Sequence, residues 1–423
     1  MFRERFCSLK KVLIITHWFP PMNMIASKRF GVMCRYFEKY GYKPYVLTTE
    51  AHKIAGNGFS IDMKCPLDEE QITRIGQMGM RYIPKSLLFN ILNSALMFLG
   101  IFLNTMNPSA IGRYEKVKKE LDINRFQDID IIIGTYPEID CIYLANYLSK
   151  KLNCPYIADI RDMVDFSDGI PKGLKHNVKL DILIEKFALQ NASAIVPVTH
   201  GYKKILRQRY LRKKIKVVYN GWENAEGKQE SEGRGAMPDC KYLYYAGVIY
   251  EHRLESFVLL AQCIKEVNEE EHIELVIRST GPIENEKKMK SIIKKNGLDR
   301  IVKVLEAEKQ EKVRSEQITA YINVVLSTIH SDDEELMATI PGKTFELLSF
   351  EKPILAIVPE KSDVSKLLKR TNKGIGTTDK AKIIDFILGS EGKYRGNDKV
   401  LRYSREIQAE KYCKIMDKIL AER

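Results

Sequence analysis

Short runs of β-branched and other apolar residues alternate with amphipathic stretches along the first half of the chain. Continuous apolar runs of this kind are typical of strands buried on both faces, and apolar residues at helical spacing indicate the helices that cover them. The pattern predicts strands at 12–16, 45–49, 130–135, 156–160, 194–199 and 215–219, with helices at 27–40, 139–152, 178–190 and 202–210. Such alternation is typical of a doubly wound parallel sheet.

The pattern breaks near the middle of the chain and then restarts. Residues 223–239 are rich in Gly, Glu, Ser and Lys and almost lack apolar residues, which indicates a linker. Beyond the linker, strands are predicted at 242–246, 273–278, 302–305, 324–327 and 353–358, with a last helix at 400–420. The predicted fold class is α/β with two Rossmann-like domains, and the predicted boundaries are 1–222, linker 223–240, 241–398 and C-terminal helix 399–423.

Length and composition agree with two domains. The chain has 423 residues, against roughly 150 for an ordinary domain. Its 44% hydrophobic and 29% charged residues exclude a disordered, collagen-like or coiled-coil chain. The eight cysteines form no Cys-x-x-Cys pair and no zinc-type spacing with histidine, so we expect reduced thiols and no metal site. The apolar run after the first cations is too short for a signal peptide, which predicts a cytoplasmic protein.

The net charge of +13 lies in the first half of the chain. Residues 1–222 hold 34 basic and 20 acidic residues, so +14, whereas residues 223–423 hold 34 and 35, so −1. This asymmetry indicates an anionic partner for the first half: membrane surface, nucleic acid or phosphorylated substrate. The basic run, as we call it, comprises eight cations without a nearby acid: Lys203, Lys204, Arg207, Arg209, Arg212, Lys213, Lys214 and Lys216.

Residues 86–112 contain no charged side chain. Their apolar core is long enough to raise the question of a transmembrane helix. However, several asparagines recur at helical spacing, and spanning helices rarely carry them without partners. Three interpretations stay open: a buried helix or helix pair, a helix that dips into one leaflet, and a true membrane span.

Ligands of doubly wound sheets bind beyond the carboxyl ends of the strands, so the loops that follow the strands hold the candidate binding residues. In the first domain, the loop after the first strand passes two prolines and opens a helix with cations, which favours an anion. The fourth of the predicted strands ends in Arg161 and Asp162, suited to clamping a phosphate and contacting sugar hydroxyls. The further candidates on this side are His17, Pro21, Ser27, Arg29 and Glu138. The alternative for the proline loop is a rigid turn with a solvated basic face, and the alternative for Arg161 and Asp162 is a surface ion pair.

In the second domain, two loops carry candidate anion-binding residues. Gly247 ends the first strand and lets a phosphate approach the backbone, and Arg253 follows it. The stretch from Thr339 to Leu355 opens a helix with Gly342, Lys343 and Thr344 and places Glu346 one turn further on, where its carboxylate can accept from ribose hydroxyls. A capped surface helix with ordinary charges is the alternative. The absence of Gly-x-Gly-x-x-Gly argues against a dinucleotide cofactor, and we expect no cofactor.

Four motifs in order along the chain resemble the GT-B glycosyltransferases of family 4, specifically the bacterial surface-polysaccharide branch. They are Phe19-Pro-Pro21 with Ser27-Lys-Arg29, Asp159-Ile-Arg-Asp162, Asn220-Gly221 and Gly342-Lys-Thr-Phe-Glu346. The resemblance runs from about residue 12 to 355. It implies two Rossmann lobes around a nucleotide-sugar, a final helix that returns to the first lobe, and a retaining, metal-independent transfer.

The resemblance also implies residue roles. Glu346 would bind the ribose, while Lys343, Arg253 and the Gly247 loop would bind the diphosphate. Arg161 and Asp162 would lie near the transferred sugar. The sequence departs from the family at Ala338, where members commonly have Glu, and at Val248, where many have Arg.

The main hypothesis is a transferase that moves a sugar from a nucleotide-sugar to a lipid-linked or polysaccharide acceptor at the inner face of the plasma membrane. Departure of a nucleoside diphosphate needs fixed cations rather than a strong base. A metal at Asp128 and Asp130 is disfavoured because both precede their strand. The alternatives are a sugar-nucleotide epimerase and a non-catalytic, glycosyltransferase-like partner subunit. A nucleic-acid binder fits poorly because only Tyr210 interrupts the basic run.

Overall fold

The structure is a computed structural model, and it describes residues 9–51, 60–75, 117–137, 139–163, 178–223, 240–279, 281 and 283–423. The chain forms two compact units. Unit 1 comprises Met1–Val198, Tyr202–Tyr219 and Arg405–Arg423, and unit 2 comprises Thr199–Gly201 and Asn220–Ser404. The charge-free stretch 86–112 and the linker residues 224–239 lie outside the described residues.

Unit 1 is built on a parallel six-stranded sheet in the order β5-β3-β1-β6-β7-β8. Its strands are β1 (Lys10–Ile15), β3 (Tyr42–Thr49), β5 (Ile72–Ile75), β6 (Ile131–Tyr136), β7 (Tyr156–Ile160) and β8 (Ala194–Pro197). The strand order is that of a Rossmann fold, and it reverses direction between β1 and β6. A separate antiparallel pair joins β2 (Met22–Asn23) to β4 (Ser60–Ile61).

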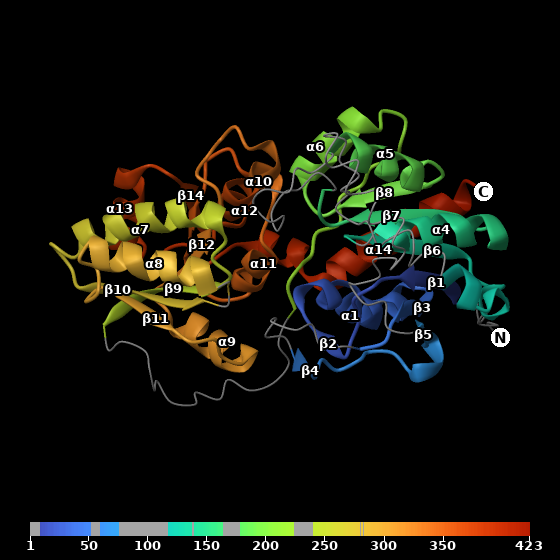
Figure 1. Ribbon diagram of the computed structural model, residues 1–423, viewed down its shortest axis with the longest axis horizontal. Coiled ribbons are helices and arrows are strands. Elements are labelled where there is room, and N and C mark those ends of the chain that lie inside the picture. The colour runs from blue at the N-terminus through green and yellow to red at the C-terminus, as the bar shows by residue number, and fades with distance from the viewer. Residues whose placement is uncertain are drawn as a thin grey trace, which may run out of the picture. The chain divides into compact units, whose positions relative to one another are not determined.

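Helices cover both faces of this sheet (Figure 1). They are α1 (Ile25–Phe37), α4 (Ile139–Leu152), α5 (Val178–Leu189), α6 (His200–Arg209) and α14 (Arg405–Ala421). The core between the sheet and α1 includes Phe30 and Phe37, which pack with Tyr412 and Met416 of α14. The last helix is therefore part of unit 1, although it follows unit 2 in the chain.

Unit 2 repeats the same topology with the strand order β11-β10-β9-β12-β13-β14, again all parallel. Its strands are β9 (Lys241–Gly247), β10 (Ile273–Ser279), β11 (Val302–Leu305), β12 (Ile322–Leu326), β13 (Ile354–Ile357) and β14 (Gly374–Thr377). Its helices are α7 (Leu254–Val267), α8 (Ile283–Lys295), α9 (Gln310–Thr319), α10 (Glu334–Ala338), α11 (Gly342–Leu348), α12 (Asp363–Thr371) and α13 (Lys380–Gly389). The order reverses between β9 and β12.

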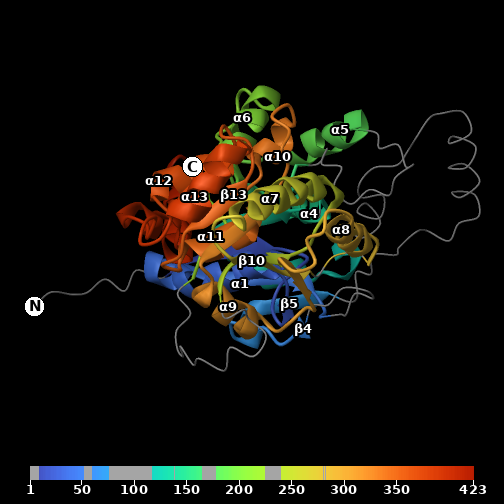
Figure 2. The ribbon, with the colours of Figure 1, turned by 90° about the vertical axis from the view of Figure 1, so that its left-hand side faces the viewer.

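The core of unit 2 lies mainly between its sheet and helices α7, α8 and α13. Figure 2 shows α9 on the other side of β10 from α7. There the Tyr242 and Tyr244 rings pack against α9, and Tyr244 donates a hydrogen bond to Glu316, which also pairs with Arg278 at 2.5 Å. Burial and the neighbouring Glu316 raise the pKa of Tyr244 far above its ordinary range.

Most predicted elements are confirmed, and the exceptions have local causes. The predicted strand at 215–219 runs parallel to β8 with a bridge between Ile195 and Ile215 and a hydrogen bond from the Val218 amide to the Pro197 carbonyl, but it does not form a regular strand. β14 is missed because its glycines hide the apolar pattern, although Gly374 is required where a Cβ would lie 1.8 Å from the Ile354 carbonyl oxygen. The last helix is divided at Ser404, where the short 3₁₀ helix Asp398–Tyr403 ends and α14 begins.

Candidate functional site

A lysine and a glycine are in contact at the switch point of the second sheet. Lys343, the second residue of α11, donates from Nζ to the carbonyl of Ala246 at 3.0 Å. Its ammonium nitrogen lies 3.5 Å from the centre of the Tyr245 ring. Gly247 has φ +141°, and a Cβ added to it would lie 2.9 Å from Nζ. Position 247 therefore needs glycine both for its backbone conformation and for the space that Lys343 occupies.

We expect Gly247→Ala to lower the free energy of unfolding by about 1–3 kcal/mol, because it forces strained backbone and crowds the ammonium. Urea unfolding measures the loss. Gly392→Ala is the matched control, since Gly392 also has positive φ but a Cβ there would meet nothing within 4 Å. An equal loss in both variants would contradict a special contact at Gly247.

Arg253 brings a second cation to the same loop. It ends the 3₁₀ turn Glu251–Arg253 and donates from Nη1 to the carbonyl of Val248 at 2.8 Å. Its guanidinium lies over the ring of Tyr250, 4.8 Å from the ring centre. The Tyr245 hydroxyl donates to the same Val248 carbonyl at 2.8 Å. Two aromatic rings and two backbone carbonyls, Ala246 for Lys343 and Val248 for Arg253, therefore hold the cations beside the end of β9.

The electrostatics of this pair favour an anion. Burial lowers the pKa of Lys343 well below its ordinary value, and the positive charge of Arg253 lowers it further. An anion bound beside both groups would stabilise the ammonium and raise that pKa again. Fixed cations at the carboxyl end of β9, next to the reversal of strand order, form the arrangement in which open α/β sheets bind phosphorylated ligands.

Helix α11 supplies the remaining predicted residues of this side. It starts at Gly342 and has seven residues, so the anion site depends on the two cations more than on the helix dipole. Thr344 is completely buried, and among the described residues its hydroxyl has no hydrogen-bond partner. Glu346 lies one turn beyond Lys343 and is partly buried. The structure thus brings Gly247, Arg253 and Lys343 together, with Glu346 on the same helix.

The departure at Ala338 has a clear structural setting. Ala338 ends α10 and is 4% exposed. Asp333 caps that helix by accepting from the Leu336 amide at 2.8 Å, and Glu334 and Glu335 form its first turn. Asp333 therefore has a local structural role.

In unit 1, Arg29 forms a buried ion pair with Asp159. Their side chains are 1% and 0% exposed, and the contact is bidentate, with Nη2 to Oδ1 at 2.6 Å and Nε to Oδ2 at 3.0 Å. Thr135 and Tyr412 donate hydroxyl hydrogen bonds to the same carboxylate at 2.8 and 2.7 Å. Burial and the Asp159 carboxylate raise the pKa of Tyr412 well above its ordinary value.

Arg29 also donates to the carbonyls of Val218 and Tyr219, both at 3.0 Å. It therefore joins α1, β7, α14 and the segment after α6 within unit 1. Its burial and these contacts give Arg29 a structural role in the unit. The acceptor-side role that its place at the helix start indicates stays a prediction.

Arg161 and Asp162 follow β7 at the carboxyl edge of the first sheet. Arg161 donates to the carbonyls of Tyr136 and Ala26, both at 2.7 Å, and so ties the end of β6 to the start of α1. Burial lowers the pKa of Arg161. Burial raises the pKa of Asp162, and the charge of Arg161 partly offsets this. Arg161 thus positions the loops, and Asp162 is the acid next to it.

The loop after β1 lies at the same edge. His17 is 1% exposed and packs edge-on against Trp18, with ring centres 4.3 Å apart. Ser27 is completely buried, and its hydroxyl has no hydrogen-bond partner among the described residues. Pro21 follows the cis Pro20–Pro21 peptide bond. Glu138, the last predicted residue of this side, lies outside the described residues.

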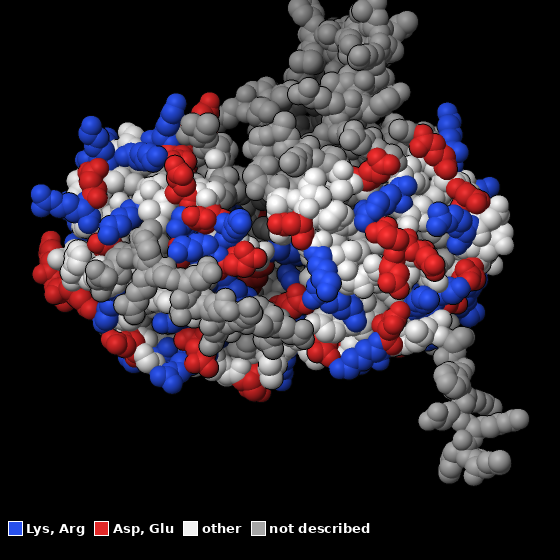
Figure 3. All heavy atoms as spheres, turned by 90° about the horizontal axis from the view of Figure 1, so that it is seen from below, with Lys and Arg blue, Asp and Glu red and all other residues white. Residues whose placement is uncertain are grey.

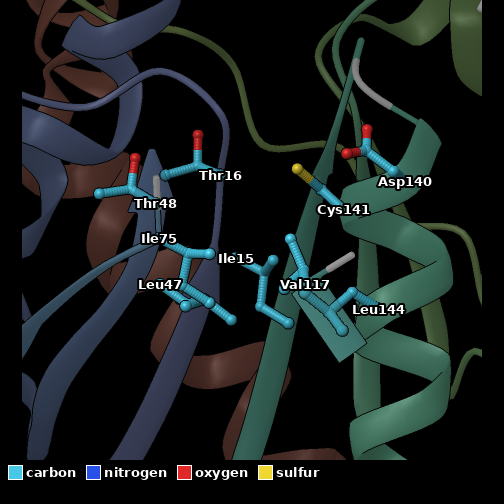
Figure 4. Close-up of a pocket in the computed structure, with 9 residues that line it drawn as sticks. All are labelled: Ile15, Thr16, Leu47, Thr48, Ile75, Val117, Asp140, Cys141 and Leu144. Carbon is cyan, nitrogen blue, oxygen red and sulfur yellow. The ribbon is translucent and has the colours of Figure 1, made fainter. Parts of the chain in front are cut away.

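A small pocket opens between β1, β3, β5 and α4 of unit 1 (Figure 4). Aliphatic side chains form its floor, and the oxygens of Thr16, Thr48 and Asp140 lie toward one end. Ile75 and Val117, which flank the stretch 76–116, both line it. The pocket was not predicted, because three separated strands and one helix contribute to it.

Sequence reasoning missed two groups of residues at these edges. Asp159 carried a usable signal, since it is a lone acid within a buried apolar strand and so required a partner. Tyr245 and Tyr250 carried none, because ordinary strand and loop tyrosines have the same appearance in a sequence. Their contacts with Lys343 and Arg253 depend on the register of β9 and on the turn that follows it.

The fold is that of the GT-B proteins, according to comparison with solved structures. A glycosyltransferase from Rickettsia africae matches with TM-score 0.62 and 14% identity, over 98% of this chain and 100% of its own. HepE from Anabaena, solved with UDP and glucose, matches with TM-score 0.55 and 11% identity, over 98% of each chain. A protein assigned as a UDP-N-acetylglucosamine 2-epimerase from Listeria monocytogenes has TM-score 0.53 and 13% identity, also over 98% of each.

No protein-family model matches the sequence, and no curated protein does either. At these sequence identities the structural likeness establishes the fold but neither the activity nor the substrate.

Proposed function

We propose that the protein is a retaining, metal-independent glycosyltransferase that moves a sugar from a nucleotide-sugar donor to a lipid-linked or polysaccharide acceptor in cell-surface glycan biosynthesis. The observation that carries the proposal is the pair of cations, Lys343 and Arg253, held beside Gly247 at the switch point of unit 2. Structural neighbours that bind UDP or UDP-glucose share the fold.

In the proposed mechanism, the diphosphate lies against Lys343, Arg253 and the Gly247 and Gly342 backbones, and Glu346 accepts hydrogen bonds from the ribose. Negative charge grows on the leaving phosphate as the glycosidic bond breaks, and the two fixed cations stabilise it. The acceptor oxygen forms the new bond to the anomeric carbon on the face that the phosphate leaves, and the proton of the acceptor hydroxyl passes to the leaving phosphate. The resemblance assigns Asp162, which follows Arg161 in unit 1, to the transferred sugar, and this role is part of the proposal.

A thermal-shift panel of nucleoside diphosphates and nucleotide-sugars tests donor binding. We expect at least one nucleoside diphosphate to raise the melting temperature of the wild type, with a smaller rise in Glu346→Ala. Stabilisation by none of them would refute the transferase proposal. Equal stabilisation of both proteins would refute the role of Glu346.

We further propose that unit 1 binds the anionic inner face of the plasma membrane. Arg207 and Lys204 are exposed on α6, and Arg212 and Lys216 follow it. Three large apolar side chains nearby in the sequence are also exposed: Leu183 at 47%, Phe187 at 56% and Leu211 at 87%. Leu183 and Phe187 share one face of α5, since they are four residues apart. The Tyr210 hydroxyl donates to Glu185 at 2.5 Å and so joins α5 to the end of α6.

The residues that the structure describes include no helix with the length and hydropathy of a membrane span. Figure 3 shows acidic and basic side chains intermingled over the face that it draws. The membrane proposal therefore depends on the basic run and its apolar neighbours, because cations near an anionic surface contribute about 1 kcal/mol each.

A variant with four glutamines should bind anionic vesicles roughly a thousandfold more weakly, because it loses about 4 kcal/mol of binding free energy. The glutamines replace Lys204, Arg207, Arg212 and Lys216. Vesicle flotation measures this. Arg209 and Lys213 are left unchanged because they pair with Glu185 and with backbone carbonyls. The control replaces four exposed lysines of α8, Lys287, Lys290, Lys294 and Lys295. Unchanged binding of the first variant, or equal loss in both, would refute the proposal.

A non-catalytic subunit is the second candidate, and the absence of a carboxylate at Ala338 favours it. Such a protein would bind a nucleoside diphosphate without turning over any nucleotide-sugar. An assay of nucleoside diphosphate release from the donor that binds in the thermal-shift panel separates the two functions.

A further inference from the structure

Three metal-ligand side chains meet at the amino-terminal edge of the second sheet. Cys240 immediately precedes β9, His272 immediately precedes β10, and Glu274 is the second residue of β10. The two strands are neighbours, with Lys241 opposite Ile273. The thiol, imidazole and carboxylate ligand atoms of the three residues all lie within 4.8 Å of one another.

Asn268 fixes the hydrogen on the imidazole ring. Its Nδ2 donates to the carbonyls of Ile264 and Ile273 at 2.9 and 2.8 Å, so its Oδ1 must be the acceptor. That oxygen lies 3.2 Å from His272 Nδ1, which therefore donates. The other ring nitrogen, Nε2, lies 3.7 Å from Glu274 Oε1. The imidazole and the carboxylate therefore present one ligand atom each toward the same place, beside the Cys240 thiol.

The carboxylate is also held in place. Glu274 is 7% exposed, and its Oε2 lies 2.7 Å from Lys303 Nζ. Lys303 therefore orients the group through one oxygen, while Oε1 lies toward His272. Outer partners of this kind, an amide on the histidine and a cation on the carboxylate, are typical of sites that orient metal ligands.

We propose that Cys240, His272 and Glu274 bind a divalent, thiophilic cation of the zinc type. Sulfur, imidazole and carboxylate ligands suit this ion, and three protein ligands leave one position for water. Zinc–ligand bonds of about 2.0–2.3 Å place tetrahedral ligands about 3.5 Å apart, so the ligand atoms must close by at most about 1.3 Å. Exposed His272 and partly exposed Cys240 have room to do so.

This site is independent of the proposed transfer reaction. Gly247 and Lys343 lie at the carboxyl end of β9, whereas the three ligands lie at the amino ends of β9 and β10, about 20 Å away along the strands. A metal here links two strands and stabilises unit 2. The sequence predicted no metal site because Cys240 and His272 are far apart along the chain, and only the parallel pairing of β9 with β10 brings them together.

The test is a Co²⁺ titration of the full chain after its metals have been removed by a chelator. We expect one equivalent of Co²⁺ to give the thiolate-to-cobalt charge-transfer absorption, Zn²⁺ to displace it, and Zn²⁺ to raise the melting temperature. Cys240→Ser should abolish the absorption. Asn268→Ala should weaken Zn²⁺ binding by about 10- to 100-fold.

Matched controls keep the test specific. Cys65→Ser replaces another partly exposed thiol, and His330→Ala removes an exposed histidine that lies 2.6 Å from Glu255 without a cysteine nearby. Both should bind Zn²⁺ as the wild type does. Absence of a stoichiometric metal, or a charge-transfer band that survives in Cys240→Ser, would overturn the proposal. If Cys240→Ser does not fold, unchanged Zn²⁺ affinity in His272→Ala and Glu274→Gln would overturn it equally.

Discussion

Replacing Lys343 with methionine should weaken the binding of a nucleoside diphosphate by about 10- to 150-fold, because one charged hydrogen-bond donor contributes about 1.5–3 kcal/mol. Titration calorimetry with the nucleotide from the thermal-shift panel measures this loss. Lys366→Met is the matched control, since Lys366 is 60% exposed on α12. Equal affinity of the two variants would contradict the placement of the diphosphate.

The same substitution should leave the free protein at least as stable as the wild type. The pKa of Lys343 is lower in the folded chain than its ordinary value of 10.5, so the unfolded chain binds more protons in the window between the two values. Wild-type stability should therefore rise with pH through that window, and Lys343→Met should lack this rise. If Lys343→Met is less stable than the wild type, Lys343 stabilises the fold and is not a cation kept for binding an anion.

The affinity of the wild type for the nucleotide should have the opposite dependence on pH. A bound anion favours the protonated form of Lys343. At a pH above the pKa that Lys343 has in the ligand-free protein, binding therefore takes up a proton, and the affinity falls as the pH rises. Lys343→Met should bind weakly with no such slope, and an equal slope in both proteins would place the titrating group elsewhere.

Asp159→Asn should lower the free energy of unfolding by about 3–5 kcal/mol, because it leaves the Arg29 guanidinium buried without its counter-charge. Urea unfolding of both proteins measures the difference. Because Tyr412 of α14 also donates to Asp159, the last helix should lose its protection from hydrogen exchange first.

Two comparisons make this result specific. Arg29→Met combined with Asp159→Leu should recover much of the loss, because an apolar pair replaces the buried ion pair. Glu406→Gln removes the partner of exposed Lys39 and should have no measurable effect. If Asp159→Asn lowers the free energy of unfolding no more than Glu406→Gln does, the buried ion pair does not stabilise unit 1.

The fold could be predicted because its signals are local. Buried apolar strands such as 156–160 and amphipathic helices such as 139–152 are apparent in the sequence and are confirmed at the same bounds. β14 could not be predicted because glycines occupy two of its four positions. The segment expected as a strand at 215–219 has the right residue types and bonds to β8 through its backbone, but the ladder is too short and irregular to form a strand.

The candidate site divides in the same way. Gly247, Arg253 and Lys343 were predicted from motifs at strand ends, and the structure brings them together because both loops leave the carboxyl edge of one parallel sheet. The position of Arg29 at a helix start is equally compatible with a ligand and with a buried partner. The structure pairs Arg29 with the Asp159 carboxylate, a contact that the spacing of residues along the chain does not indicate, and the acceptor-side role of Arg29 stays a prediction.

The most direct test of retaining sugar transfer is proton NMR of the anomeric signals while the protein turns over the nucleotide-sugar that stabilises it. With an α-linked donor, we expect the first sugar released, or transferred to an added acceptor, to have the α configuration, with stoichiometric nucleoside diphosphate. Conversion of the donor to an epimer, or binding without any release of nucleoside diphosphate, would contradict it.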